Sequence, residues 1–182
     1  MKKVKFGKLK TVYRGIIFDI KQQELVFPNG EKKIYEYSYR DDSVMILPFD
    51  KKGNLMMIRE YRSAHNKYVW FLPAGRMDKP GESPRASAQR ELREELGYRA
   101  RDLKLLSKRY PSGHAVYNVY VFMARDLVVD PLSGDESLPI KVMAVPLKKA
   151  VQMALDGTIQ NEFIAFNIVR FDYLKRNGKF KW

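Results

Sequence analysis

The sequence contains no cysteine, and only two of its 182 residues are histidine. Without cysteine the chain has no disulfide framework, no thiolate nucleophile and no cysteine-bound zinc. His65 and His114 stand alone, with no partner at the spacing of metal ligands. We therefore expect oxygen atoms to hold any metal ion. The absence of cysteine also agrees with a location in the cytoplasm.

Long apolar runs are missing as well. No stretch approaches the roughly 20 apolar residues that a membrane-spanning helix needs, so we expect no membrane partner. Residues 1–10 are basic but lack a following apolar region, so we expect no signal peptide. The sequence shows no internal repeat, and 182 residues suffice for one full domain with a small appendage.

Negative charge is scarce relative to positive charge. Lys and Arg number 34 against 21 Asp and Glu, which gives a formal net charge of +13. Such a balance attracts polyanions. The basic residues are scattered, however, and no basic-aromatic repeat like that of an RNA-recognition motif is present. We interpret the charge as solubility and as steering of an anionic substrate, and we do not expect nucleic acid as a partner.

The pattern of apolar residues predicts a strand-rich segment, residues 1–41, and a main domain, residues 42–182. Alternation and turn residues predict strands over 11–20, 34–39, 44–49, 55–61, 68–72, 103–110, 115–124 and 140–145. Helical spacing predicts helices over 84–96, 147–155 and 162–175, the last with Phe163, Phe166, Val169 and Tyr173 on one side. Strands and helices in this order predict an α/β sandwich with a mixed sheet.

Three carboxylates, Glu91, Glu94 and Glu95, lie close together in the first predicted helix. At about 100° per residue, Glu91 and Glu95 are about 40° apart around the helix. Like charges at this spacing repel one another, and a cation between them removes the repulsion. Oxygen ligands of this kind suit Mg²⁺ or Mn²⁺. The alternative is a solvated charged face that Arg90 and Arg93 balance.

The residues before this helix favour the metal site over the charged face. Ser83 suits the N-cap, Pro84 suits the first turn, and Gly97 suits the end of the helix. Upstream, the predicted strand over 68–72 leads into Pro73-Ala74-Gly75 and a turn-rich loop. A strand, a glycine loop and a carboxylate-bearing helix together form a concave site for a metal ion and a phosphate.

These residues resemble the Nudix box, the signature of the Nudix hydrolase superfamily. The match comprises Gly75, Glu82, Arg90-Glu91-Leu92, Glu94-Glu95 and Gly97-Tyr98. Every position from Glu82 onward agrees in residue type and spacing. Six residues separate Gly75 from Glu82, where the usual pattern has five. An added loop residue is inexpensive, so we expect a longer bulge and an intact site.

Other segments resemble the ADP-ribose pyrophosphatases and nucleoside diphosphate sugar hydrolases of this superfamily. They are Ile58–Arg62, Trp70–Gly75, Tyr110–Gly113 and Asp156–Ile159. The chain departs from this subgroup at Phe71, where glutamate is frequent, and around Gly113 and Asn118. The resemblance implies a Nudix-type α/β/α sandwich and a β-rich N-terminal segment that helps to form a homodimer.

The resemblance also implies a reaction. It is the Mg²⁺-dependent hydrolysis of the diphosphate bond of ADP-ribose or another nucleoside diphosphate sugar, which gives a nucleoside monophosphate and a sugar phosphate. Mn²⁺ could replace Mg²⁺. The implied metal ligands are the carbonyl of Ala74 and the side chains of Glu91, Glu94 and Glu95.

The remaining roles also follow from the resemblance. The implied catalytic residues are Glu94, Glu95, Arg90, which orients a carboxylate, and the general base Glu136, with Asp135 as the alternative base. The implied substrate-binding residues are Arg62, Arg59, Met77 and Pro111. The alternative role for Arg62 is a surface salt bridge with Glu60.

Two competing functions stay open from the sequence. Hydrolysis of RNA 5′ ends would suit the positive charge, but it would need a continuous basic channel leading to the carboxylates. A binding module or regulator that has lost catalysis would suit the same fold. The intact Glu91, Glu94 and Glu95 argue against this loss, because inactivation usually removes a metal ligand.

Overall fold

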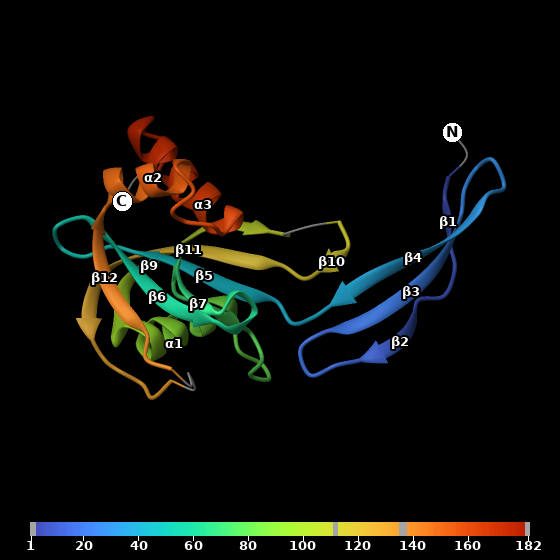
Figure 1. Cartoon of the computed structure of the whole chain (residues 1–182), viewed down its shortest axis with the longest axis horizontal. Coiled ribbons are helices and arrows are strands. Elements are labelled where there is room, and N and C mark those ends of the chain that lie inside the picture. The colour runs from blue at the N-terminus through green and yellow to red at the C-terminus, as the bar shows by residue number, and fades with distance from the viewer. Residues whose placement is uncertain (1–2, 111–112, 135–137, 181–182) are drawn as a thin grey trace.

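A computed structural model describes residues 3–110, 113–134 and 138–180. Figure 1 shows a main body with helices on two sides and a narrow β arm that projects from it. The strands are β1 (Lys5–Phe6), β2 (Lys10–Arg14), β3 (Asp19–Val26), β4 (Lys32–Tyr39), β5 (Ser43–Pro48), β6 (Asn54–Arg62), β7 (Lys67–Phe71), β8 (Ala74–Arg76), β9 (Tyr98–Arg109), β10 (Ala115–Val116), β11 (Val119–Val129) and β12 (Lys141–Pro146). The helices are α1 (Pro84–Leu96), α2 (Leu147–Leu155) and α3 (Glu162–Arg176), with a 3₁₀ turn, η1 (Ser63–His65).

Two sheets form the body. In the first, ordered β8-β5-β11-β9, β5 and β11 are parallel and the other neighbours are antiparallel. The second, ordered β12-β6-β7, is antiparallel throughout. Helices α2 and α3 cover one side of the body and α1 covers the other (Figure 1). The prediction of an α/β/α sandwich with a mixed sheet is therefore confirmed.

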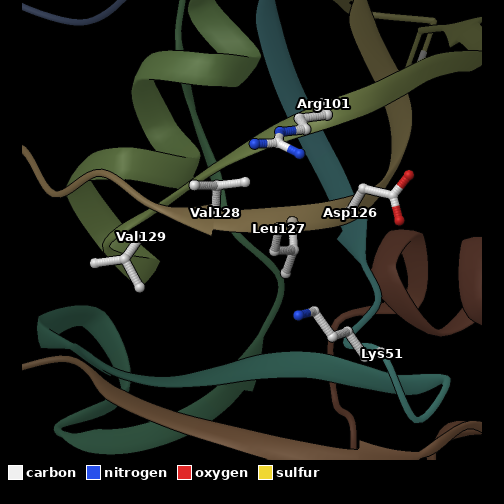
Figure 2. Close-up of a pocket in the computed structure, with 6 residues that line it drawn as sticks. All are labelled: Lys51, Arg101, Asp126, Leu127, Val128 and Val129. Atoms are coloured by element: carbon white, nitrogen blue, oxygen red, sulfur yellow. The ribbon is translucent and has the colours of Figure 1, made fainter.

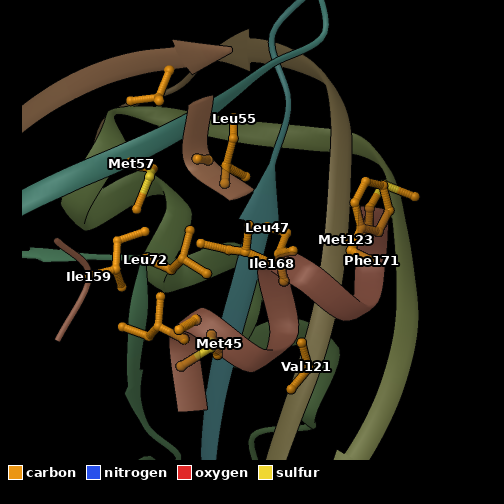
Figure 3. Close-up of a cluster of buried hydrophobic side chains, with 14 of the residues drawn as sticks. Met45, Leu47, Leu55, Met57, Leu72, Val121, Met123, Ile159, Ile168 and Phe171 are labelled. Atoms are coloured by element: carbon orange, nitrogen blue, oxygen red, sulfur yellow. The ribbon is translucent and has the colours of Figure 1, made fainter. Parts of the chain in front are cut away.

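Strand β5 is buried on both faces, and it contributes to two apolar clusters. Met45 and Leu47 belong to the cluster that includes α3 (Figure 3). Val44 and Ile46 belong to the cluster that includes α1. Because successive residues of a strand point to opposite faces, one strand fixes the position of helices on both sides of the body.

Helix α1 begins and ends where the sequence predicts. The Ser83 hydroxyl accepts a hydrogen bond of 3.2 Å from the backbone N–H of Ala86, and Gly97 ends the helix with a φ of 75°. The side-chain amide of Gln89 exchanges hydrogen bonds of 2.6 and 2.9 Å with the backbone of Ala100 on β9. The helix is thus attached to the edge strand of the mixed sheet, and its orientation is fixed.

Helix α3 has the predicted bounds within one residue, but the prediction of its apolar side was wrong. Phe166 and Tyr173 are 55% and 53% exposed, whereas Ile164, Ile168 and Phe171 are fully buried. The aromatic residues led to the prediction of one buried face. The face that is buried in the structure instead carries the aliphatic residues at helical spacing. Packing against β5 and β6 selects the side that fits the space available.

The projecting arm is the sheet β1-β3-β4-β10, with β2 paired to β3. The predicted turn at Asn29-Gly30 is confirmed, with Gly30 at a φ of 89°. The single strand predicted over 11–20 was wrong, because the chain turns at Gly15, whose N–H bonds to the carbonyl of Phe18 at 2.9 Å. This turn divides the segment into β2 and β3.

The predicted division after residue 41 falls in the connection between β4 and β5. Strand β10 comes from the later part of the chain, yet it pairs with β4 in parallel. The arm and the body therefore share a sheet contact, and the division into two units stays a prediction. None of the helices in the described ranges is long and apolar enough to span a membrane.

Candidate active site

The candidate site begins where β8 contacts α1. Strand β8 pairs with β5, with Gly75 opposite Val44. A Cβ atom built on Gly75 would lie 2.0 Å from Oε1 of Glu91. The absence of a side chain at this position therefore lets the carboxylate of Glu91 lie directly against the loop, where its side chain is only 8% exposed.

Glu95 reaches the same loop one helical turn later. Its Oε2 atom accepts a hydrogen bond of 3.0 Å from the backbone N–H of Ala74. Glu95 is 9% exposed. Two of the three predicted carboxylates are thus buried at the β8–α1 contact, as the separation of about 40° around the helix requires.

Arg90 joins the remaining acidic residues. Its guanidinium donates hydrogen bonds of 2.6 Å to Glu91, 2.9 Å to Glu94 and 3.1 Å to Glu82. It also donates to the carbonyl of Arg76 at 3.0 Å. The predicted contact of Arg90 with a carboxylate is therefore present, although its contribution to catalysis stays a prediction.

The electrostatics of this cluster follow from the burial of Arg90. Burial by itself lowers the pKa of Arg90, but its hydrogen bonds to Glu82 and Glu94 and the charge of Glu91 outweigh burial and hold the pKa above its ordinary value. Arg90 therefore stays charged. The side chains of Arg90, Glu82 and Glu94 are 17%, 13% and 21% exposed. Such burial does not agree with a solvated charged face.

The predicted metal ligands provide the type of donor that a divalent cation needs. Within the described ranges, no three Asp, Glu, His or Cys side chains already stand in the arrangement of a metal site. The residues nevertheless fit a hard divalent cation by their chemistry, because the donors are carboxylate oxygens. Because Gly75 has no side chain, the Glu91 carboxylate has room to lie beside β8, which also carries the Ala74 carbonyl.

The two predicted arginines of β6 lie on opposite faces of the strand. Arg62 lies on the side of Ile58, which packs in the same cluster as Leu92 of α1. Arg59 lies on the other side, where it donates a hydrogen bond of 2.9 Å to the carbonyl of Tyr68. The structure therefore brings Arg62, and not Arg59, to the face of β6 that α1 covers.

Arg62 is held by two neighbours. It forms a salt bridge of 2.8 Å with Glu60, and its guanidinium lies 4.3 Å from the centre of the Phe71 ring. The salt bridge with Glu60, which the sequence left open as the alternative for Arg62, is thus present. The side chain of Arg62 keeps 40% of its surface exposed, so the bridge leaves part of the side chain accessible.

Of the other predicted substrate contacts, Met77 is described and Pro111 is not. The backbone N–H of Met77 bonds to the carbonyl of Asp42 at 2.8 Å, and its side chain packs against the cluster that includes α1. Pro111 and both candidate bases, Glu136 and Asp135, lie outside the described residues. Their roles stay predictions.

Sequence reasoning assigned no role to Asp42 beyond a segment boundary. Its carboxylate accepts hydrogen bonds from Asn118, at 2.7 Å from the backbone N–H and 3.1 Å from the side-chain amide. These bonds join the residues immediately before β5 and β11, beside a cavity of about 410 Å³ that Tyr110 and Tyr117 also line. No local pattern could indicate this contact, because 76 residues separate the partners.

A second cavity, of about 530 Å³, lies between the end of β11 and the turn before β6 (Figure 2). Its lining comprises Lys51, Arg101, Asp126, Leu127, Val128 and Val129. None of the predicted site residues lines it. The cluster around Arg90 thus remains the candidate active site because of its chemistry, and the size of the neighbouring cavities does not decide the matter.

Comparisons with known proteins agree with this geometry. The sequence model of the NUDIX domain matches residues 39–165. An ADP-ribose pyrophosphatase of Bacillus subtilis (strain 168) is 29% identical over 162 residues, which cover 87% of each chain. The ADP compounds hydrolase NudE of Escherichia coli (strain K12) is 31% identical over 176 residues, which cover 94% of this chain and 93% of that protein.

The fold comparison gives the same result. The crystal structure of an ADP compounds hydrolase superposes with a TM-score of 0.84 at 31% sequence identity, covering 99% of this chain and 98% of that one. The family match extends from the end of β4 into α3 and includes all residues of the Arg90 cluster. The chain therefore belongs to the Nudix family, and it is a hydrolase of the pyrophosphatase class.

Proposed function

We propose that the protein hydrolyses the diphosphate bond of ADP-ribose or another nucleoside diphosphate sugar in the presence of Mg²⁺ or Mn²⁺. The products are a nucleoside monophosphate and a sugar phosphate. The observation that carries the proposal is the burial of Glu91 and Glu95 against the Ala74–Gly75 loop, with Arg90 binding Glu91 and Glu94. The substrates named for the relatives support the choice of nucleotide.

Each residue of the candidate site has its own role in this proposed reaction. Glu91, Glu94, Glu95 and the Ala74 carbonyl would hold the cation, which supplies charge neutralisation at phosphate oxygens and a more acidic water molecule. Arg90 keeps the carboxylates oriented from α1. Glu136, or else Asp135, takes a proton from the attacking water.

Arg62 binds the diphosphate in this proposal. Its planar guanidinium presents several N–H donors that match phosphate oxygens. Met77 and Pro111 complete the proposed substrate contacts, and Arg59 is a weaker candidate because it lies on the other face of β6. The added residue between Gly75 and Glu82 leaves the contacts of Arg90 with Glu82 in place.

We also propose that two copies of the chain form a homodimer through the arm. The support is the apolar surface that the arm exposes, at Phe6, Val12, Tyr13, Ile16, Ile17, Phe18 and Ile34. Exposed apolar patches of this kind mark interaction surfaces. A cytoplasmic location stays a prediction, which fractionation of the source cells would test.

The test of the reaction is a substrate panel. The purified protein is incubated with ADP-ribose, GDP-mannose, a dinucleoside polyphosphate and 5′-triphosphorylated RNA, with Mg²⁺ and separately with a chelator. We expect a nucleoside monophosphate from the nucleotide sugars and no product with the chelator. Turnover of the RNA alone would overturn the proposal, and binding of ADP-ribose without any turnover would favour a non-catalytic regulator.

A further inference from the structure

Arg62 lies on the α1 side of β6, and it is held by two groups at once. Glu60 pairs with it at 2.8 Å, and the centre of the Phe71 ring lies 4.3 Å from the guanidinium. Glu60 and Arg62 are two residues apart on one strand, so both side chains point to the same face. Phe71 stands on the neighbouring strand β7.

The two members of the salt bridge differ in their surroundings. The side chain of Glu60 is 10% exposed, whereas that of Arg62 is 40% exposed. Burying a carboxylate is costly unless it is paired, so Glu60 is fixed in place. An exposed arginine otherwise samples many rotamers. The buried carboxylate therefore restricts Arg62 while part of the Arg62 side chain stays exposed.

Phe71 connects this arginine to the candidate site. Its ring packs against both apolar clusters of the body, so it cannot turn freely. Phe71 ends β7, and β8, which begins with Ala74 and Gly75, follows after two residues. A guanidinium above an aromatic ring is attracted to the face of that ring. The ring thus sets the position of Arg62 relative to β8, against which the carboxylates of α1 lie.

We infer that Glu60 and Phe71 are positioning residues that orient the Arg62 guanidinium toward the phosphate oxygens of the substrate. This inference rests on the proposed function. Glu60 fixes one side of the guanidinium by charge, and Phe71 supports its face. Preorganisation of this kind lowers the entropy lost when the substrate binds.

A double-mutant cycle with Glu60→Gln and Arg62→Ala tests the inference. Glutamine keeps the size of the side chain but removes its charge. We expect Glu60→Gln to raise KM for ADP-ribose about tenfold with little change in kcat. In the Arg62→Ala background, Glu60→Gln is expected to add almost nothing, because the group that it positions is gone. Equal effects of Glu60→Gln in both backgrounds would overturn the inference.

A matched control comes from another salt bridge of the body. Asp102 pairs with Arg125 at 2.6 Å between β9 and β11. Asp102→Asn is expected to leave KM unchanged. This result would show that a rise in KM comes from loss of the Glu60–Arg62 pair and not from loss of an ion pair in general. If Glu60→Gln fails to fold, Phe71→Leu replaces it, with a smaller expected rise in KM that again disappears in the Arg62→Ala background.

The outcomes distinguish this inference from the proposed function. A wild-type protein that turns over no nucleotide sugar contradicts the proposed function. An active wild-type protein whose KM is unchanged by Glu60→Gln and by Phe71→Leu contradicts the positioning role and leaves the reaction intact.

Discussion

At the scale of single residues, Arg90 determines the charge balance of the candidate site. It binds Glu82, Glu91 and Glu94 from a largely buried position. Removing one member of a buried charged group leaves the others uncompensated, which is more costly than the net value of the pairs. Arg90 thus keeps the carboxylates of α1 together before any cation is bound.

Glu95→Gln separates ligand chemistry from folding. The amide oxygen of glutamine can still accept the hydrogen bond from Ala74, but it is a poorer ligand for a hard cation. We expect kcat to fall by about 100-fold or more, with little change in the melting temperature. The control is Glu162→Gln in the first turn of α3. A variant with a rate near that of the wild type would refute the assignment of Glu95 as a ligand.

Gly75→Ala tests the contact between loop and helix. Its Cβ would meet the Glu91 carboxylate at 2.0 Å, so either the side chain or β8 must move. We expect a loss of activity of about tenfold or more, on the order expected when a metal ligand is misplaced, and a lower melting temperature. Gly113→Ala is the control, because a Cβ atom at that position would have nothing within 4 Å among the described residues. Equal behaviour of the two variants would contradict the contact.

Asn167→Leu tests a buried polar group in α3. Asn167 is fully buried, its amide donates to the carbonyl of Phe163, and its Oδ1 has no partner among the described residues. Leucine removes this uncompensated oxygen, so we expect the free energy of unfolding in urea to rise by about 1 kcal/mol. Asn177→Leu is the control, because Asn177 makes the same type of bond on the surface. A loss of stability in Asn167→Leu relative to the wild type would contradict this expectation.

At the scale of elements, α1 carries three of the acidic residues of the candidate site, and its first turn depends on Ser83. We expect Ser83→Ala to lower the free energy of unfolding by about 1 kcal/mol, because the N–H of Ala86 loses its acceptor. Denaturant unfolding measures the change. Ser133→Ala, at an exposed position in the loop after β11, serves as the control. No difference between the two variants would contradict the role of the cap.

The elements were predicted best where local signals coincide. The bounds of α1 follow from Ser83, Pro84 and Gly97, which act on the nearest turns of the chain. The prediction of one strand over 11–20 was wrong because the chain turns at Gly15, and the pattern of apolar residues gives no sign of this turn. The prediction of the buried face of α3 was wrong because the helix has an aromatic side and an aliphatic side. Only contact with the sheets determines which of the two is buried.

At the scale of the whole molecule, the arm determines the predicted assembly. Ile16 is 99% exposed at its β2–β3 turn. If the arm surface is covered in a homodimer, Ile16→Glu should shift the molar mass in light scattering from that of a dimer toward that of a monomer. Leu155→Glu, at an exposed position on the body, should leave the mass unchanged. A wild-type protein that is monomeric at micromolar concentration would contradict the dimer.

The candidate site was predicted in its chemistry but not in its contacts. The resemblance placed Glu91, Glu94 and Glu95 together, and the structure brings Glu91 and Glu95 to the Ala74–Gly75 loop. The resemblance made Arg62 the main candidate for a phosphate contact and Arg59 a weaker one, and the period of a strand puts residues three apart on opposite faces. The contact of Asp42 with Asn118 was not predicted, since nothing near either residue indicates it.

The amino-acid sequence predicts the family, the residue types of the candidate site, and the start and end of α1. These depend on neighbours along the chain and on the chemistry of each side chain. The packing of the folded chain was needed to show that Glu95 binds the Ala74 backbone, that Arg62 contacts both Glu60 and Phe71, and which face of α3 is buried. The physical reason is that these arrangements depend on contacts between separate elements, and their free energy arises only when the sheets and helices pack.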